Sequence, residues 1–425
     1  MTIAGMQLYL GEKEHEMCTP QALSTLLNTL FSHTEVPRLM LWNCLGHHYL
    51  EAVSTSCRSH GVKLYLWYPV LADKLETAYG AKAVPVMMVQ SAWDHSGYGV
   101  AGLWQGIDAG EETFRFHCPN AVADWELFAG EFLALISTGL YDGVFLDRIR
   151  YPSPSNGMEM LFSCFCPACQ LRYQELGIDS VELKHKATHA LSHMAREWEA
   201  IEHPAFDNSA PFSSWIGFLA DSGLAQMQTM KTRSIAKVAA WFAAEARRRN
   251  LQVGADLFSP SLAPLVGQDY LAFREFCDWI KPMAYFHARG PAGIQLEMGC
   301  LRKGVSALTD LDPEQTCKFL SLITGLPVAE RGIGCADTLV DPRYLRFEVS
   351  KAFSLGSSAD CAVFPGLEMV HHPRFAPPVT ETMLRTSLSY LPQDTRGMIP
   401  SWNLLYIPDE YLRIVAETNP GGQVC

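Results

Sequence analysis

The sequence lacks the features that mark membrane, exported or nucleic-acid-binding proteins. No segment reaches the roughly 18 uninterrupted apolar residues of a spanning helix, and the start, MTIAGMQLYLGEKEHEMC, has no positive region followed by a long apolar run. Basic residues are the minority, with 33 Lys and Arg against 45 Asp and Glu and a formal net charge of −12. An acidic chain without a Lys/Arg run does not suit a phosphate backbone. We therefore expect a cytoplasmic protein that binds neither nucleic acid nor membranes.

The sequence also has no G-x-G-x-x-G motif after any predicted strand, which leaves dinucleotide binding without support. What it does have is an alternation of short β-branched or aromatic runs with longer amphipathic runs. The predicted strands are 6–11, 38–44, 62–70, 142–150, 251–257, 279–285, 331–337 and 360–365. Eight strand–helix units predict an α/β fold, a closed (β/α)8 barrel, and a doubly wound open sheet is the alternative.

The predicted barrel domain spans residues 1–395. Long segments follow its third and fourth strands, at 71–120 and 151–215, and we expect them to form loop excursions. Residues 396–425 are rich in Pro, Asn and Gly, which predicts a tail that packs on the barrel.

Acidic residues stand at or after several strand ends, where the active site of such a barrel lies. The catalytic candidates are Asp147, Asp256, Asp337 and Glu368. Asp147 ends the apolar run GVFLD and is the strongest, because a buried strand there meets the cleft. The non-catalytic alternatives are an arginine pairing for Asp147, a helix-cap or turn role for Asp256 and Asp337, and an exposed loop for Glu368.

Aromatic and polar residues accompany these acids at the strand ends. The substrate-binding candidates are Trp42, Asn43, Trp67, Tyr68, Arg148, Lys281, Tyr285 and His287. Sugars need such a mixture, because two carboxyl groups share the acid, base and nucleophile duties while aromatic faces stack on the rings. A carboxyl separation of about 5 Å implies retention, and roughly 6.5–9.5 Å implies inversion. The pattern predicts a glycoside hydrolase with a carbohydrate substrate.

The chain has 13 cysteines, and three of them form a C-x-C-x-x-C run: Cys164, Cys166 and Cys169. In a reducing compartment such a run favours a metal over disulfides. Structural zinc needs four ligands, and Cys118 in FHCPN is the best fourth. Four thiolates leave no open position, so we expect structural zinc that holds the loop after strand four. Free, redox-active thiols are the alternative.

This arrangement resembles the zinc-binding barrel domain of the glycoside hydrolase family 42 β-galactosidases, where one Cys precedes a helix and three follow the fourth strand. Cys118, Cys164, Cys166 and Cys169 match that spacing. The run DGVFLDRIRYPSP also resembles the GIHLDYIRYP-type run of uncharacterised glycosyl-hydrolase-like barrels, and WIKPMAY resembles a later strand of those proteins. The matching pieces lie mainly in 115–175 and 278–286. The resemblance implies a glycoside-hydrolase-like barrel.

The chain departs from family 42 at strand four. Those enzymes carry an Asn-Glu pair there, whereas this chain has Asp147 followed by Arg148, so β-galactosidase activity is not implied. Acids at strands four, five and seven are similar to those of α-amylase-type barrels, with a fourth-strand nucleophile and a fifth-strand acid. Asp147, Asp256 and Asp337 would take those places, although Phe145 stands where that family has Arg.

A glycoside hydrolase is thus the expected function. A non-catalytic carbohydrate-binding barrel and a zinc or thiol redox sensor are the alternatives. The sugar, its anomer, the cleavage mode and the oligomeric state, self-association included, are left open.

Overall fold

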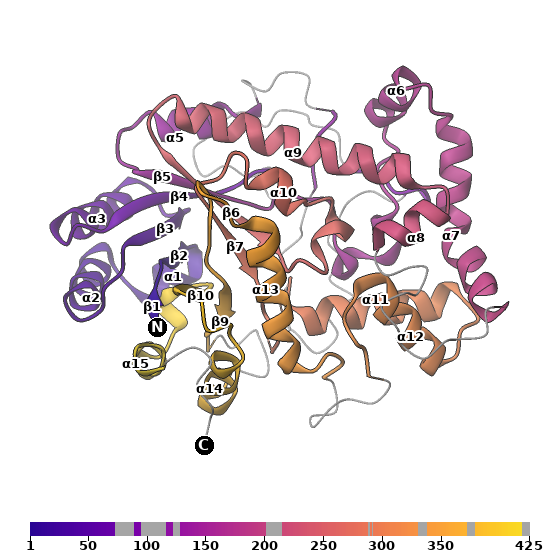
Figure 1. The fold of residues 1–425 in the computed structure, drawn as a ribbon. Helices are drawn as coiled ribbons and strands as arrows, with labels where there is room; N and C mark the ends of the chain where they lie inside the picture. The colour runs from indigo at the N-terminus through magenta and orange to yellow at the C-terminus, as the bar shows by residue number, and fades with distance from the viewer. Residues whose placement is uncertain are drawn as a thin grey trace.

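The computed structural model describes residues 1–72, 89–94, 116–121, 128–200, 215–287, 290, 292–329, 338–371 and 379–418. Within these residues the core is a sheet of parallel strands with helices packed around it (Figure 1). The strands are β1 Thr2–Ile3, β2 Met6–Leu10, β3 Arg38–Asn43, β4 Lys63–Pro69, β5 Gly143–Asp147, β6 Gln252–Phe258, β7 Trp279–Met283, β8 Ala362–Val363, β9 Gly366–Glu368 and β10 Gly397–Ser401.

The sheet curls round into a barrel. Its strand order is β1-β10-β9-β7-β6-β5-β4-β3-β2, with β8 also paired to β7, and every pairing is parallel. Only Ala4 and Gly5 separate β1 from β2, so one stretch of chain pairs with β10 through β1 and with β3 through β2. The two ends of the sheet therefore meet, and the predicted (β/α)8 class is confirmed.

Helices cover the outside of the barrel and build the segment after β5. They are α1 Glu12–Met17, α2 Pro20–His33, α3 His47–Ser59, α5 Gly130–Ile136, α6 Pro167–Glu175, α7 Ser180–Ala200, α8 Trp215–Asp221, α9 Ala225–Arg247, α10 Tyr270–Phe273, α11 Ile294–Leu308, α12 Pro313–Thr324, α13 Leu345–Gly356, α14 Glu381–Ser389 and α15 Asp409–Glu417. In Figure 1, α6, α7 and α8 lie on the opposite side of the molecule from α2 and α3. None of the described helices is both long enough and apolar enough to cross a membrane.

Local signals start several of these helices. Thr19 caps α2 by accepting a hydrogen bond from the Ala22 N–H at 3.2 Å, and Pro20 occupies the first helical position, as predicted. Asp312 and Gln315 form a reciprocal capping box at the start of α12. These caps fix the residue at which each of the two helices begins.

Strand assignment from the sequence fails near the C-terminus. The first six predicted strands correspond to β2 through β7, and the predicted strand at 331–337 lies outside the described residues. The segment 360–365 contains β8 and ends just before β9, and both strands pair directly with β7. The place between β9 and β1 is taken by β10, at 397–401, which was predicted to belong to a tail. This strand has Met398 and Ile399 as its only large apolar side chains, so its pattern resembles a loop although its partners make it a barrel strand.

Alternation along the strands separates the barrel interior from the helix-facing layer. One buried cluster fills the interior: Ala4, Met40, Tyr65, Trp67, Phe145, Trp279 and Ile399. The rings of Phe145 and Trp279 stack there with centroids 5.0 Å apart. A Cβ on Gly254 would collide with the Trp279 ring, so this strand needs glycine to admit the indole.

Candidate active site and cysteine cluster

Three charged side chains stand in one row across β5, β6 and β7: Asp147 is the last residue of β5, whereas Asp256 and Lys281 lie within β6 and β7. Leu146 pairs with Ala255, so continuing the register by one residue places Asp147 beside Asp256. Asp256 in turn pairs with Lys281. Register partners on parallel strands point to the same face of the sheet. The row therefore faces the barrel interior, two residues beyond the aromatic filling.

Asp147 is held in position by donors on two sides. Its Oδ2 accepts a hydrogen bond from Trp67 Nε1 at 2.9 Å, and its Oδ1 accepts one from the Arg148 N–H. Burial raises the pKa of Asp147, while these hydrogen bonds and the charges of Lys281 and Arg150 oppose the rise. The side chain is half-buried, so a ligand at the barrel mouth can reach it.

Asp256 is more enclosed, with 3% of its surface exposed. Its Oδ2 accepts a hydrogen bond from Lys281 Nζ at 2.9 Å, and no described residue bonds its Oδ1. Burial raises the pKa of Asp256 to about 7, the Lys281 charge opposes that rise, and the Asp147 charge adds to it. The carboxyl groups of Asp147 and Asp256 thus act on each other.

Lys281 is the centre of a buried polar network. Its Nζ lies 2.7 Å from Gln7 Oε1, 2.7 Å from Tyr285 Oη and 3.2 Å from Ser401 Oγ, besides Asp256, so its three N–H groups are shared among four acceptors. Tyr285 and Ser401 are hydrogen-bonded to each other through their hydroxyls. None of the Lys281 surface is exposed. The network therefore holds the Asp256 carboxylate in place through Lys281. Lys281 and Tyr285 are too buried to offer much surface to a ligand.

Aromatic rings stand beside this row. Trp42 lies edge-on to Tyr9 and to Trp67, with ring centroids 5.4 Å and 5.5 Å away, and Tyr9 is also edge-on to Trp402 at 6.3 Å. The guanidinium of Arg148 lies 4.8 Å from the Trp42 ring centroid. Arg148 has a φ of +53°, a left-handed conformation that costs a non-glycine residue free energy and is typical of functional sites.

Two of the predicted binding residues are not brought to this site. Tyr68 follows Trp67 on β4 and so points to the other face, where it packs 5.1 Å from the Phe132 ring. Asn43 is committed to the turn before α3, because its Nδ2 donates to the Gly46 carbonyl at 2.8 Å. Both residues were chosen because they lie near the end of a strand. The period-two alternation along the strand decides in addition which side chains face the barrel interior.

The remaining predicted acids have different surroundings. Glu368 pairs in register with Ser401 and accepts a hydrogen bond from the His287 N–H. His287 Nε2 lies 3.0 Å from Ser387 Oγ, and burial lowers the pKa of His287 to about 4, so its ring is neutral at pH 7. Glu368 is therefore close to the network, although on the opposite side from Asp147. Asp337 lies outside the described residues.

Four residues of the site escaped sequence reasoning: Gln7, Tyr9, Ser401 and Trp402. Gln7 and Tyr9 occupy alternate positions of the strand MQLYL, so strict period-two reading of that strand would have turned both inward. Ser401 and Trp402 carried no such signal, because their strand was not recognised.

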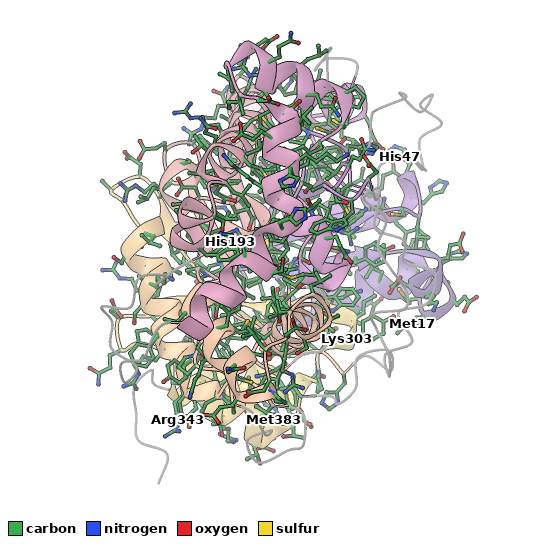
Figure 2. The ribbon with its side chains drawn as sticks, turned by 90° about the vertical axis from the view of Figure 1, so that its right-hand side faces the viewer. Met17, His47, His193, Lys303, Arg343 and Met383 are labelled. Carbon is green, nitrogen blue, oxygen red and sulfur yellow. The ribbon has the colours of Figure 1, made fainter. Side chains whose placement is uncertain are left out.

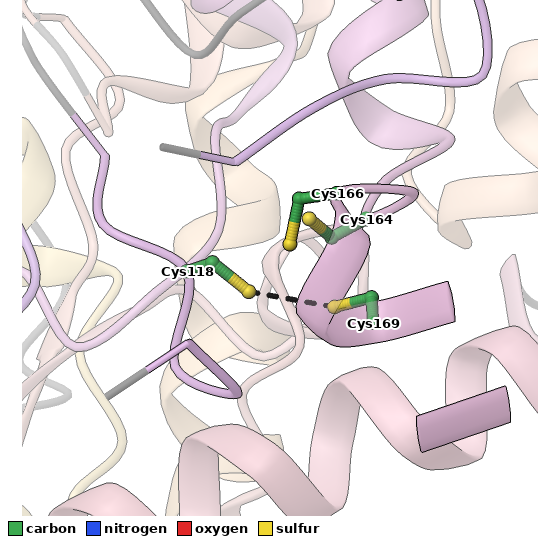
Figure 3. A group of neighbouring side chains, drawn as sticks. All are labelled: Cys118, Cys164, Cys166 and Cys169. Carbon is green, nitrogen blue, oxygen red and sulfur yellow. Dashed lines mark hydrogen bonds between the residues drawn. The ribbon is translucent and has the colours of Figure 1, made fainter. Parts of the chain in front are cut away.

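The second candidate site is the cysteine cluster, whose four sulfurs gather as predicted (Figure 3). The Sγ atoms of Cys118, Cys164, Cys166 and Cys169 lie within 4.8 Å of one another, and all four residues are buried. A tetrahedral site with Zn–S bonds of about 2.3 Å places its sulfurs roughly 3.8 Å apart. Hydrogen bonds from the other three thiols lower the pKa of Cys166, whereas those neighbours and burial raise that of Cys118. The set suits a soft divalent cation.

Polar groups around the cluster point N–H donors at its sulfurs. The Gln90 N–H donates to Cys164 Sγ at 3.3 Å, and Asn120 Nδ2 donates to Cys169 Sγ at 3.4 Å. Ser234 Oγ on α9 donates to Asn120 Oδ1 at 2.9 Å and so fixes that amide. Such donors stabilise thiolates and orient them, which metal centres require. The cluster connects the segment after β4 with the segment after β5.

No protein-family model matches the sequence, and the search of curated proteins finds no match. Solved structures that resemble the chain include the glycoside hydrolase domain of PgaB (BpsB) from Bordetella bronchiseptica, at 14% identity and a TM-score of 0.41, covering 85% of this chain and 94% of that one. A chitinase from Chromobacterium violaceum ATCC 12472 has 8% identity and a TM-score of 0.43 over 97% of this chain and 98% of that one.

The spore cortex-lytic enzyme SleL from Bacillus megaterium QM B1551 is a third such structure, at 9% identity and a TM-score of 0.42, covering 100% of this chain and 76% of that one. At identities this low a likeness concerns the arrangement of strands and helices alone. The barrel itself is established by the strand pairing described above.

Proposed function

We propose that this protein is a glycoside hydrolase in which Asp147 and Asp256 act together on one glycosidic bond. The observation that carries the proposal is their placement side by side on β5 and β6, with their charges coupled. Neighbouring strands lie about 4.8 Å apart. That spacing is near the roughly 5–5.5 Å that separates the carboxyl groups of retaining enzymes. We therefore propose retention, which the anomer of the freshly released sugar reveals by NMR.

The surroundings of the two acids favour different roles. The two hydrogen bonds to Asp147 stabilise its carboxylate form, which suits a nucleophile. Asp256 has a pKa of about 7, so near neutral pH it is partly protonated and can give a proton to the leaving oxygen. Its free Oδ1 is the oxygen that would carry that proton. Lys281 would position Asp256 rather than contact the sugar.

A sugar would lie against the aromatic side of the mouth. Trp42, Tyr9 and Trp402 are half-buried there and can pack against the apolar face of a ring. Arg148 and His287 would orient hydroxyl groups or a sugar carboxylate. Glu368 is the third acid in the neighbourhood, and we keep it as a reserve candidate together with Asp337.

We also propose that the cysteine cluster holds one structural zinc ion, bound by Cys118, Cys164, Cys166 and Cys169. Four thiolates would complete its coordination, so the ion would brace the two loop segments and take no part in hydrolysis. The donors from Gln90 and Asn120 fit such a centre.

The test is turnover of a panel of chromogenic aryl glycosides by the wild type, by Asp147→Asn and by Asp256→Asn. Each variant should lose at least ~10³-fold in kcat/KM while its circular dichroism spectrum stays that of the wild type. Asp360→Asn, an exposed aspartate, is the matched control and should keep full activity. Near-normal turnover by both active-site variants would refute the assignment.

A non-catalytic carbohydrate-binding barrel is the second candidate. The observation that favours it is the enclosed ion pair of Asp256 with Lys281, which would commit Asp256 to structure. Binding of sugars by the wild type without turnover of any of the glycosides would establish this function instead.

A further inference from the structure

Helix α7 exposes three histidines that repeat every four residues: His185, His189 and His193. Residues four apart are neighbours on one helix face, so these side chains line a single stripe. Figure 2 labels His193 on the side of the molecule that carries α7. The rings of His185 and His189 lie 4.3 Å apart between centroids and are tilted by only 27°. Two imidazoles are thus already side by side on the surface.

Hydrogen bonds determine which ring nitrogen of His189 carries the proton. Its Nδ1 lies 2.9 Å from the His185 carbonyl oxygen and 3.0 Å from Thr188 Oγ1. A carbonyl oxygen only accepts, so Nδ1 carries the proton and donates it, which leaves the lone pair on Nε2. No described residue is hydrogen-bonded to that Nε2. Metal-bound histidines show the same arrangement, with the other ring N–H given to a carbonyl or carboxylate.

The cationic neighbours of this pair are already neutralised. Lys184 Nζ lies 2.7 Å and 2.9 Å from the carboxylate oxygens of Asp94, and Lys186 Nζ lies 2.7 Å from Glu182. The chain as a whole carries a formal charge of −12. A metal cation that binds beside His185 therefore meets little electrostatic repulsion from these two lysines.

We propose that α7 carries a transition-metal site in which His185 and His189 chelate one Zn²⁺, Ni²⁺ or Cu²⁺ ion. Imidazole nitrogen suits these three ions, and two histidines four apart on one helix face are a known zinc-binding spacing. Two protein ligands leave the other coordination positions to water or to an incoming group. The site is thus an open, exchangeable one, unlike the cysteine cluster, whose four sulfurs would close the coordination sphere. His193 lies one turn further along the same face.

The experiment is calorimetric titration of Ni²⁺ into the full chain after its cysteine cluster has been saturated with zinc. The wild type should bind one Ni²⁺ ion, and His185→Ala and His189→Ala should each weaken that binding at least ~10-fold. His33→Ala, a lone exposed histidine at the end of α2, is the matched control and should bind as the wild type does.

The side chains of His185, His189 and His33 are exposed, so the thermal unfolding midpoints of the three variants should match the wild type and exclude misfolding. Unchanged Ni²⁺ affinity in both His185→Ala and His189→Ala would overturn the proposal.

Discussion

Lys281 Nζ and Asp256 Oδ2 lie 2.9 Å apart inside the barrel, and the two side chains expose 0% and 3% of their surface. A complete ion pair is therefore enclosed between β6 and β7. Removing one partner of such a pair leaves the other charge buried and uncompensated, which costs far more than the pair itself contributes. The free energy of unfolding thus depends on whether Asp256, a proposed catalytic acid, keeps its counter-charge.

Replacing the lysine tests this coupling. Lys281→Met should lower the free energy of unfolding by about 3–5 kcal/mol, because Asp256 then loses its counter-charge in a buried site. Urea denaturation followed by circular dichroism measures the loss. Lys318→Met is the matched control, since Lys318 pairs with Glu314 at the surface and its removal should cost less than about 1 kcal/mol. Equal losses in the two variants would contradict a structural role for the buried pair.

The indole N–H of Trp67 should lower the pKa of Asp147. Trp67→Phe removes the Nε1–H donor to Asp147 Oδ2, and a hydrogen bond to a charged group is worth about 1.5–3 kcal/mol. The pKa of Asp147 should therefore rise, because the Trp67 hydrogen bond holds it down. The acid limb of the kcat/KM profile should shift to higher pH. Trp93→Phe, a half-buried tryptophan that packs on Phe162, should leave the limb in place. An unmoved limb in Trp67→Phe would show that this bond does not act on the catalytic carboxylate.

The raised pKa of Asp256 predicts an alkaline limb as well. A proton donor must be protonated, so kcat/KM should fall about tenfold per pH unit above pH 7. The same shift acts on stability. Asp256 binds its proton more tightly when folded, since the unfolded pKa is near 3.9, so its contribution is complete below about pH 4 and is lost as the pH rises through about 7. Thermal unfolding midpoints should follow this trend. A flat kcat/KM profile between pH 6 and 9 would argue against Asp256 as the donor.

Metal analysis tests the cysteine cluster. The purified protein should carry about one zinc ion per chain, and Cys118→Ala should lose it. Stripping the ion should lower the thermal midpoint, because the segments after β4 and β5 are then joined only by weaker contacts. Cys57→Ala, a buried cysteine outside the cluster, should keep its zinc. A metal-free protein whose cluster cysteines oxidise reversibly would instead favour the redox-sensor alternative.

The barrel class was predictable because most strands carry their signal locally. Segments such as 38–44 and 62–70 are continuous apolar runs bounded by turns, as expected for strands buried on both faces. Residues 397–401 carry no such signal, since Met398 and Ile399 are the only large apolar side chains in GMIPS. Its strand character comes from parallel pairing with β1 and β9, partners that only the closed barrel brings together. Tertiary context overrode local preference there.

The candidate site was predictable to the same extent. Asp147, Asp256 and Lys281 were candidates because a charge within or at the end of an apolar strand stands out, and the strand register brings these three side chains into one row. Tyr68 was misjudged because position along a strand does not reveal which face a side chain takes. The network that holds Lys281 was beyond reach, because Gln7 and Ser401 are 394 residues apart in the chain and meet only when the sheet closes.

The central claim is that Asp147 and Asp256 serve one bond, and a double-mutant comparison tests it most directly. Residues that act as a unit lose about as much activity singly as together. We predict that Asp147→Asn/Asp256→Asn is no slower on an aryl glycoside than the slower single variant. If the two losses multiply instead, or if either single variant keeps wild-type turnover, the acids do not share a reaction.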